Sequence, residues 1–375
     1  MIYLDYAATT PLHEEVLEGY YKVLKQYYGN SDSLHEIGRK ADRLMKQSRM
    51  QVASSLCVKE TEIFFTSCAS ESNNMAIKGY AFANAHKGKH LITTAVEHSS
   101  VLETMKQLEE VFGFSITYLP VSEDGVVRLS DLAAAVREDT ILVSCMYINN
   151  ETGAINPIKE LAAYVHTHTK AVFHCDYVQA LGKYELPLQD VDMATMSAHK
   201  IYGLKGCGLL YKREHLPIIA LISAGQQEQH LRGGTSNAPA YTMWAKTIRL
   251  ALDHQREHFA YVKTLHEMLY EAFSNMEGFV INSPQNGSVY ILNVSCEQIG
   301  SEIMLNALNA RGFAVSAQST CASKGKPHSY VLAAMGLGEL RATHAIRISL
   351  SHLTTIAEIE QFLQVIKEIY HEYRT

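Results

Sequence analysis

The sequence is poor in proline and has no long hydrophobic run. Only 8 of its 375 residues are proline and 22 are glycine, whereas 47% are hydrophobic and 19% are charged. These values exclude collagen-like, coiled-coil and disordered chains and predict a globular protein with a large core. The longest uncharged stretch, residues 278–296, contains Asn282, Pro284 and Asn293, so we do not expect it to cross a membrane. The first residues lack the basic and apolar regions of a signal peptide, which indicates a cytoplasmic protein.

Cysteine is also scarce, and basic residues are not in excess. Seven cysteines form an odd set without a C-x-x-C pair, so we expect mostly reduced core residues rather than disulfides. There are 33 Lys and Arg residues against 39 Asp and Glu, a net charge of -6, which argues against nucleic acid as a direct partner.

The 18 histidines predict no metal site, since His166 and His168 are two positions apart on a predicted helix and point in different directions.

The first two thirds of the chain have the pattern of an α/β protein. Short apolar runs alternate with stretches of helical periodicity. Because these runs are apolar throughout, both faces of each strand should be covered. We therefore predict a mostly parallel seven-stranded sheet flanked by helices. The runs are 62–66, 90–96, 115–119, 140–147, 170–175, 192–196 and 207–211.

The pattern changes after about residue 236. A long helical stretch reaches Asn275 and is followed by fewer strands and a closing helix, which predicts a smaller α+β domain. We therefore divide the chain into a large cofactor-binding domain, 13–255, and a small domain formed by 1–12 and 256–375. The later strands are expected at 288–296, 313–315 and 345–349, and the closing helix from 354.

Polar residues follow several predicted strands, where working side chains of open α/β sheets lie. Ala69 and Ser70 open a helix whose first N–H groups can hold a phosphate, although an ordinary serine cap is the commoner role. His98 follows the next strand and is either structural or suited to proton transfer. Asp176 follows another strand and either caps a helix or meets a cationic or protonated group.

Lys200 also follows a predicted strand and precedes a glycine-bearing loop. Most lysines are surface charges, but one that enters a cleft from a strand end is a candidate Schiff-base former. Pyridoxal phosphate chemistry needs such a lysine, a carboxylate at the pyridinium nitrogen and donors for the phosphate. Lys200, Asp176 and the loop at Ala69 supply all three, so the sequence predicts a pyridoxal 5'-phosphate site.

Cys321 differs from the other cysteines because it lies in a polar segment. Lys324, Lys326 and His328 follow it closely and should favour the thiolate, the reactive form. The alternative is an incidental exposed thiol.

Taken together, these positions resemble the cysteine desulfurases of the NifS/IscS type, which are class V aminotransferase-like pyridoxal phosphate enzymes of fold type I. The resemblance covers essentially the whole chain. It rests on Tyr3–Pro11, Gly29–Asn30, Phe65–Asn74, Glu97–His98, Asn149–Gly153, Asp176 with Gln179, Ser197–Lys200, Arg232–Thr235, Cys321 and Ile346–Leu350.

The resemblance implies an enzyme that removes sulfur from L-cysteine and releases L-alanine. Lys200 would bind the cofactor covalently, His98 would handle the thiol proton, and Cys321 would hold the sulfur as a persulfide. An acceptor protein would then take the sulfur for iron–sulfur clusters or for thiolation of tRNA or a cofactor. A homodimer is expected, with Thr235 supplied by the neighbouring subunit. The other implied contacts are Asp176 with the pyridine nitrogen, Gln179 with the ring hydroxyl, His98 stacked on the ring, Ala69, Ser70, Ser197 and His199 with the phosphate, Asn150 with cofactor and substrate, and Asn30 and Arg347 with the substrate.

The sequence departs from the family pattern at several of these positions. Tyr177 stands where relatives have an alanine that packs under the pyridine ring, so we expect its side chain to crowd the cofactor or to lean away. Cys68 replaces a glycine of the phosphate loop, Ser70 replaces a threonine, and Gln318 replaces a glycine before the catalytic cysteine. Segment 224–231 lacks the glycines and the first arginine common in relatives.

Two other functions are compatible with this sequence. The first is another pyridoxal phosphate reaction on the same scaffold, such as that of a selenocysteine lyase or an aminotransferase; transamination does not need Cys321. The second is a non-catalytic sulfur-trafficking protein with a decayed site, which the joint presence of Lys200, Asp176 and Arg347 argues against.

Overall fold

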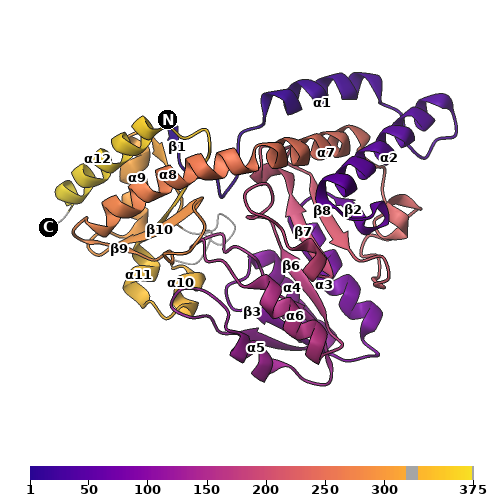
Figure 1. Cartoon of the computed structure of the whole chain (residues 1–375), viewed down its shortest axis with the longest axis horizontal. Coiled ribbons are helices and arrows are strands. Elements are labelled where there is room, and N and C mark those ends of the chain that lie inside the picture. The colour runs from indigo at the N-terminus through magenta and orange to yellow at the C-terminus, as the bar shows by residue number, and fades with distance from the viewer. Residues whose placement is uncertain (318–327, 374–375) are drawn as a thin grey trace.

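The computed structural model describes residues 1–317 and 328–373, and its largest element is a seven-stranded sheet (Figure 1). The strand order is β2-β8-β7-β6-β5-β3-β4. β8 is antiparallel to both neighbours, and the other pairs are parallel. The predicted sheet is confirmed, and each apolar run forms one strand. The strands are β2 (Ile63–Thr66), β3 (His90–Thr94), β4 (Ser115–Leu119), β5 (Thr140–Ser144), β6 (Val172–Asp176), β7 (Met193–Ser197) and β8 (Gly208–Lys212).

Helices cover both faces of this sheet. Because successive strand residues point to opposite faces, Phe64 and Phe65 of β2 enter different hydrophobic cores. The core around Phe64 contains residues of α3 and α4, and that around Phe65 contains residues of α2, α5, α6 and α7. Burial on both sides explains why the strand sequences do not alternate with polar residues. The helices are α2 (Glu36–Leu56), α3 (Ala69–Asn84), α4 (Ser99–Phe112), α5 (Leu129–Ala135), α6 (Ile158–His168) and α7 (Ala238–Asp253).

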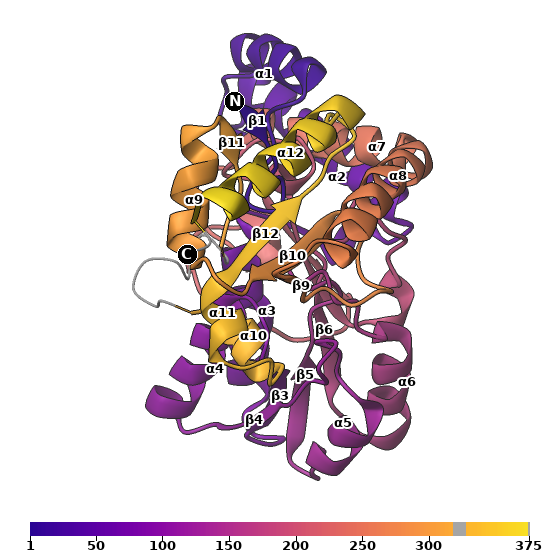
Figure 2. The ribbon, with the colours of Figure 1, turned by 90° about the vertical axis from the view of Figure 1, so that its left-hand side faces the viewer.

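The C-terminal part has its own core and a three-stranded antiparallel sheet of order β12-β10-β9 (Figure 2). The single helical stretch predicted up to Asn275 is two helices, because His254 (φ -106°, ψ 4°) interrupts it. β9 and helices α9 to α11 were not predicted; they are short, so they hold few periodic residues. The elements are α8 (Gln255–Ser274), β9 (Phe279–Ile281), β10 (Ile291–Cys296), α9 (Ser301–Ala310), α10 (Tyr330–Ala334), α11 (Glu339–His344), β12 (Ala345–Ser349) and α12 (Ile356–Tyr373).

The N-terminal residues pack against this C-terminal part. β1 (Ile2–Tyr3) pairs in parallel with β11 (Phe313–Ala314), and the Ala7 N–H donates to Ser349 Oγ at 2.9 Å. This supports the grouping of residues 1–12 with the C-terminal residues. The chain then leaves for α1 (Glu14–Gln26), which packs on α7 (Figure 1). Within the two described ranges, no helix combines the length and the apolar character that a membrane span requires.

Candidate active site

A cavity of about 180 Å³ lies where the loops after the parallel strands meet the N-terminal segment and β12. Most of the predicted site residues line it, although they come from separate loops. They are Ala69, Ser70, His98, Asn150, Asp176, Gln179, His199, Lys200 and Arg347. The other lining residues are Ala7, Ala8, Cys68, Met146, Ile148 and Val178.

Lys200 points across this cavity. It ends a 3₁₀ turn, Ala198–Lys200, that follows β7 directly. Its Nζ donates hydrogen bonds to the backbone carbonyls of Ala7 and Ala8, each at 2.6 Å. The amine is therefore held at the N-terminal wall of the cavity, within reach of a bound molecule, as a Schiff-base lysine must be.

Asp176 is the last residue of β6 and is buried. Its Oδ1 accepts the Val178 N–H at 2.9 Å, which is a local turn bond. Its Oδ2 accepts a hydrogen bond from Asn73 Nδ2 at 2.9 Å, and the same nitrogen donates to Ser100 Oγ. The helix-cap alternative is wrong, because turns and not a helix follow β6; Asp176 instead presents a fixed carboxylate to the cavity.

His98 caps the N-terminus of α4. Its Nδ1 accepts the Ser100 N–H at 3.2 Å. Since an N–H group can only donate, the neutral imidazole must carry its proton on Nε2. Burial lowers the pKa of His98; the charge of Asp176 opposes this shift, and that of Lys200 adds to it. His98 is thus a neutral ring whose available polar group is an N–H donor.

Arg347 occupies β12 with a guanidinium only 1% exposed. Its Nη1 donates to the Asn150 carbonyl at 2.7 Å, and its Nη2 to Asp5 Oδ1 at 2.8 Å. A guanidinium has five N–H donors, and Nε has no partner within the described ranges. Asn150 Oδ1 is equally unpartnered there. Asp5 therefore balances the buried charge, while donors remain for a carboxylate ligand.

The opposite end of the cavity offers groups for an anion. α3 begins beside it, and the first N–H groups of a helix have no intrahelical partner. Ser197 Oγ is buried and finds no hydrogen-bond partner in the part of the chain that is described. His199 Nδ1 lies 3.1 Å from Thr9 Oγ1. Burial and, less strongly, the charge of Lys200 lower the pKa of His199 to about 4, so this ring is neutral.

Tyr177 does not enter the cavity. Its hydroxyl donates to the Pro187 carbonyl at 3.3 Å, and its ring packs edge-on against Tyr147 in the core. Val178 lines the cavity instead. Of the two alternatives expected for Tyr177, the second holds: its side chain leans away from the cavity, and the residue that faces the cavity after β6 is the next one along the chain.

Three predicted residues of the described structure are not among those that line the cavity: Ser197, which is buried, and Asn30 and Thr235. Asn30 is exposed in the loop between α1 and α2, where its Oδ1 accepts the Asp32 N–H at 3.0 Å. Thr235 is exposed ahead of α7. Neither is among the residues that line the cavity of this chain.

Cys321 lies outside the described residues, as do Gln318, Lys324 and Lys326. The residues on either side of this segment are fixed next to the cavity. Ser316 and Arg347 form an antiparallel bridge, and Ser329 Oγ donates to Glu151 Oε2 at 2.6 Å. The chain therefore leaves and re-enters the described structure close to the substrate-binding arginine predicted from the sequence.

Comparisons with known proteins show the family to which the chain belongs. The family model "Aminotransferase class-V" matches residues 2–362. The chain belongs to this family, within its cysteine desulfurase group. A cysteine desulfurase IscS of Dictyoglomus turgidum is 39% identical over 100% of this chain and 95% of the relative. A solved NifS-like protein is 38% identical with a TM-score of 0.93, covering 99% of both chains. The solved structure "SspA in complex with cysteine" is 33% identical with a TM-score of 0.82, covering 95% of this chain and 100% of the other.

Pyridoxal 5'-phosphate is the cofactor of this family and of this protein. The residues present fit such a group. The unpartnered Ser197 hydroxyl and the start of α3 would bind the phosphate, Asp176 the ring nitrogen and Gln179 the ring hydroxyl. Lys200 would bind the aldehyde carbon.

Sequence reasoning assigned no role to Asp5, Asn73 or Glu97, although all three lie in quoted motifs. Glu97 Oε1 accepts the Met146 N–H and the Thr94 hydroxyl, each at 2.8 Å, which ties the loops after β3 and β5 together. Burial raises the pKa of Glu97 to about 8. Apart from the bond between Glu97 and Thr94, which are 3 positions apart, these residues bind partners that are 49, 103 and 342 positions away. Such distant contacts leave little signal in the sequence.

Proposed function

We propose that the protein converts L-cysteine to L-alanine and keeps the sulfur on Cys321 as a persulfide. The observation that carries this proposal is the meeting of Lys200, Asp176, His98 and Arg347 around one cavity. A decayed site would have lost this arrangement. The names of the relatives, cysteine desulfurase and a protein in complex with cysteine, support the same substrate.

The chain's own groups divide the work between binding and proton transfer. When bound, pyridoxal phosphate supplies a ring that withdraws electrons from the substrate's Cα. Arg347 binds the substrate carboxylate through its unpaired Nε–H. Lys200 Nζ moves the Cα proton, because the amine enters the cavity directly.

His98 presents its Nε2–H as a hydrogen-bond donor to charge that develops near the reacting atoms. To take up a proton itself, the ring would have to break the bond between Nδ1 and the Ser100 N–H. We therefore assign His98 chiefly to charge stabilisation.

The sulfur transfer balances without an added oxidant. The Cys321 thiolate attacks the substrate sulfur, and the Cβ–S bond breaks with its electron pair going to carbon. That carbon then gains a proton to give L-alanine. The fixed residues on either side of the Cys321 segment, Ser316 and Ser329, support its use at this cavity.

Mass spectrometry after incubation with L-cysteine tests the proposal. We expect one added sulfur atom on Cys321 and an equal amount of L-alanine in the first turnover. Cys321→Ser should lose both, while Cys68→Ser should keep both. Cys68 is the matched control because it is the cysteine, among those described, that lines the cavity. Persulfide on Cys68, or unchanged alanine formation by Cys321→Ser, would reject the assignment. Transfer of the amino group from L-cysteine to an acceptor, without release of sulfur, would favour an aminotransferase.

We further propose a cytoplasmic homodimer that passes its sulfur to an acceptor protein for iron–sulfur clusters or for thiolation of tRNA or a cofactor. Thr235 is exposed and absent from its own cavity, which suits a residue that completes a neighbouring subunit's site. Asn30 would bind substrate in the same assembled site. Mixing inactive Lys200→Ala with Thr235→Ala protein should change the activity per site if subunits share residues, and leave it unchanged otherwise.

A further inference from the structure

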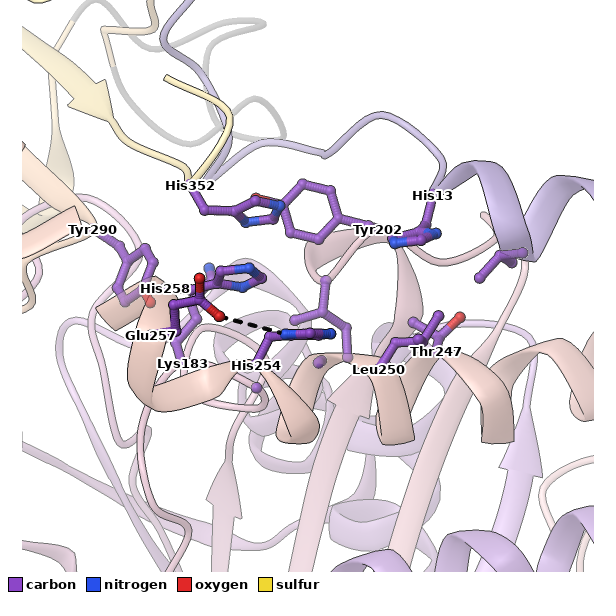
Figure 3. A pocket seen from close by; sticks show the side chains of 14 residues that line it. His13, Lys183, Tyr202, Thr247, Leu250, His254, Glu257, His258, Tyr290 and His352 are labelled. Atoms are coloured by element: carbon purple, nitrogen blue, oxygen red, sulfur yellow. Dashed lines mark ion pairs between the residues drawn. The ribbon is translucent and has the colours of Figure 1, made fainter. Parts of the chain in front are cut away.

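A second cavity, of about 330 Å³, lies between the start of α1, the junction of α7 and α8, and the loop after β12 (Figure 3). Four imidazoles and two phenol groups border it, together with one lysine and an aliphatic wall. These side chains have no role in the proposed reaction. The polar residues are His13, Lys183, Tyr202, Thr247, His254, Glu257, His258, Tyr290 and His352.

Lys183 is a cation without a counter-charge at the inner wall of this cavity. Its Nζ donates to Gln179 Oε1 at 3.2 Å and lies 5.5 Å from the centre of the Tyr290 ring. It forms no ion pair with any carboxylate in the described structure, and the charge of Arg347 is nearby. Lys183 is half-buried, and a partly desolvated charge of this kind is costly unless an anion meets it.

Tyr290 supplies a second, independent indication. Its side chain is buried, and its hydroxyl finds no hydrogen-bond partner among residues 1–317 and 328–373. A buried hydroxyl without a partner is destabilising. Because Tyr290 lines the cavity beside Lys183, an oxygen atom of a bound ligand could serve as the missing partner.

The imidazoles are not arranged for a metal ion. His254 and His258 have the H-x-x-x-H spacing of some metal sites, whereas the prediction of no metal site considered only His166 and His168. However, the rings of His258 and His352 are stacked in parallel with centroids 3.7 Å apart, so their nitrogens do not converge. No group of three potential ligands among the described residues can hold a metal. Burial, together with the neighbouring His258, lowers the pKa of His352 to about 4, so this ring is neutral and stacks flat on His258.

We propose that this cavity binds a small organic monocarboxylate. The single ammonium of Lys183 and the free hydroxyl of Tyr290 would bind the carboxylate, since one fixed positive charge matches one negative charge. Val16, Leu250 and Ala251 with the stacked imidazoles would cover the apolar body of the ligand. The space is larger than an inorganic ion requires, and its lining is partly apolar, which favours an organic ligand over phosphate.

The site is connected to the active site. Lys183 bonds Gln179, which lines the first cavity and donates its amide nitrogen to the Ala7 carbonyl at 3.0 Å. A ligand that draws the ammonium toward the second cavity would therefore weaken the bond to Gln179. Binding of the ligand does not depend on the proposed function. Only the expected effect of binding on activity rests on it.

Proton uptake accompanies the proposed binding. Burial, with the charge of Arg347, lowers the pKa of Lys183 to about 8, so part of the population is neutral at that pH. The groups facing it are Gln179, Tyr290 and the cavity imidazoles, and Glu257 stands at the exposed rim. A carboxylate raises the pKa of a neighbouring ammonium, so affinity should fall as the pH rises through 8.

Isothermal titration of the holoenzyme with benzoate tests the proposal. We expect one site per chain, proton uptake at pH 8 in two buffers of different ionisation enthalpy, and no binding of the neutral isostere benzamide. Tyr290→Phe and Lys183→Met should each weaken benzoate binding by roughly tenfold or more, because each loses a charge-assisted hydrogen bond.

Arg347→Lys separates this site from the substrate site. Benzoate affinity should be unchanged in that variant if the second cavity binds it. The proposal is overturned if benzoate does not bind, if Arg347→Lys abolishes binding, or if Tyr290→Phe binds as the wild type does. Equal binding of inorganic phosphate would also overturn the assignment to an organic monocarboxylate. These outcomes do not depend on sulfur transfer, so they are independent of the tests on Cys321.

Discussion

Replacing Asp5 with alanine should destabilise the protein through Arg347. The guanidinium is 1% exposed, the Asp5 side chain is 16% exposed, and their N–O distance is 2.8 Å. Removing one partner of a buried ion pair costs about 3–5 kcal/mol, because the other charge stays desolvated. Since Asp5 keeps some contact with water, we expect a loss of about 3 kcal/mol, at the low end of that range.

The expected shift in melting temperature follows from this loss and from the unfolding entropy, which scales with chain length. Globular proteins unfold with an entropy of about 2.1 cal/mol/K per residue, or about 0.8 kcal/mol/K for 375 residues. A loss of about 3 kcal/mol then lowers the melting temperature of Asp5→Ala by about 4 °C. Asp5→Asn keeps an acceptor oxygen without the charge, so its shift should be smaller.

Thermal unfolding of the holoenzyme, followed by intrinsic fluorescence, measures this shift. Asp42→Ala is the matched control, because Asp42 pairs with Lys46 at 2.8 Å with side chains 39% and 70% exposed. Exposed pairs contribute about 0–1 kcal/mol, so the control should melt within about 1 °C of the wild type. If Asp5→Ala melts at the same temperature as Asp42→Ala, Asp5 does not balance the buried guanidinium and the argument fails.

Four further predictions follow from the site. His98→Ala should lower kcat by about 100-fold and His98→Gln by clearly less, since the amide still donates; equal losses would contradict a donor role. In the wild type, kcat/KM should not fall as the pH decreases to 6.5, because burial lowers the pKa of His98 and the ring keeps its Nε2–H donor; a fall in that range that is absent from His98→Gln would contradict the donor role. Val178→Tyr should abolish the cofactor absorbance near 400 nm while Tyr177→Phe keeps it, and the reverse result would show that Tyr177 faces the ring. Gly208→Ala places a Cβ 2.5 Å from the Cys68 backbone and therefore displaces the phosphate loop without touching the cofactor. This variant should lose cofactor faster during dialysis. Unchanged retention would show that the loop at Cys68 can move freely.

The sheet could be predicted from the sequence because its strands are buried on both faces, which gives uninterrupted apolar runs such as that around Phe64 and Phe65. The cavity could be predicted because functional residues of such sheets follow the strands, as Asp176 and Lys200 do. The orientation of a side chain after a strand is harder to predict: whether Tyr177 or Val178 faces the cavity depends on how the backbone turns after β6.

Contacts between distant segments could not be predicted either. The four imidazoles of the second cavity come from the residue before α1, the junction of α7 and α8, α8 itself and the loop after β12, and no local pattern relates His13 to His352. The interruption at His254 also has no sequence marker, because neither glycine nor proline stands there.

The bonds from Asp5 to Arg347 and from Ala7 to Ser349 each join residues 342 positions apart. During translation, the first of these partners leaves the ribosome long before the second is made. The nascent polypeptide must therefore carry the Asp5 carboxylate and the Ala7 N–H without these partners until synthesis is nearly finished. Catalytic competence is then gained in one final docking step, after most of the seven-stranded sheet can already have formed.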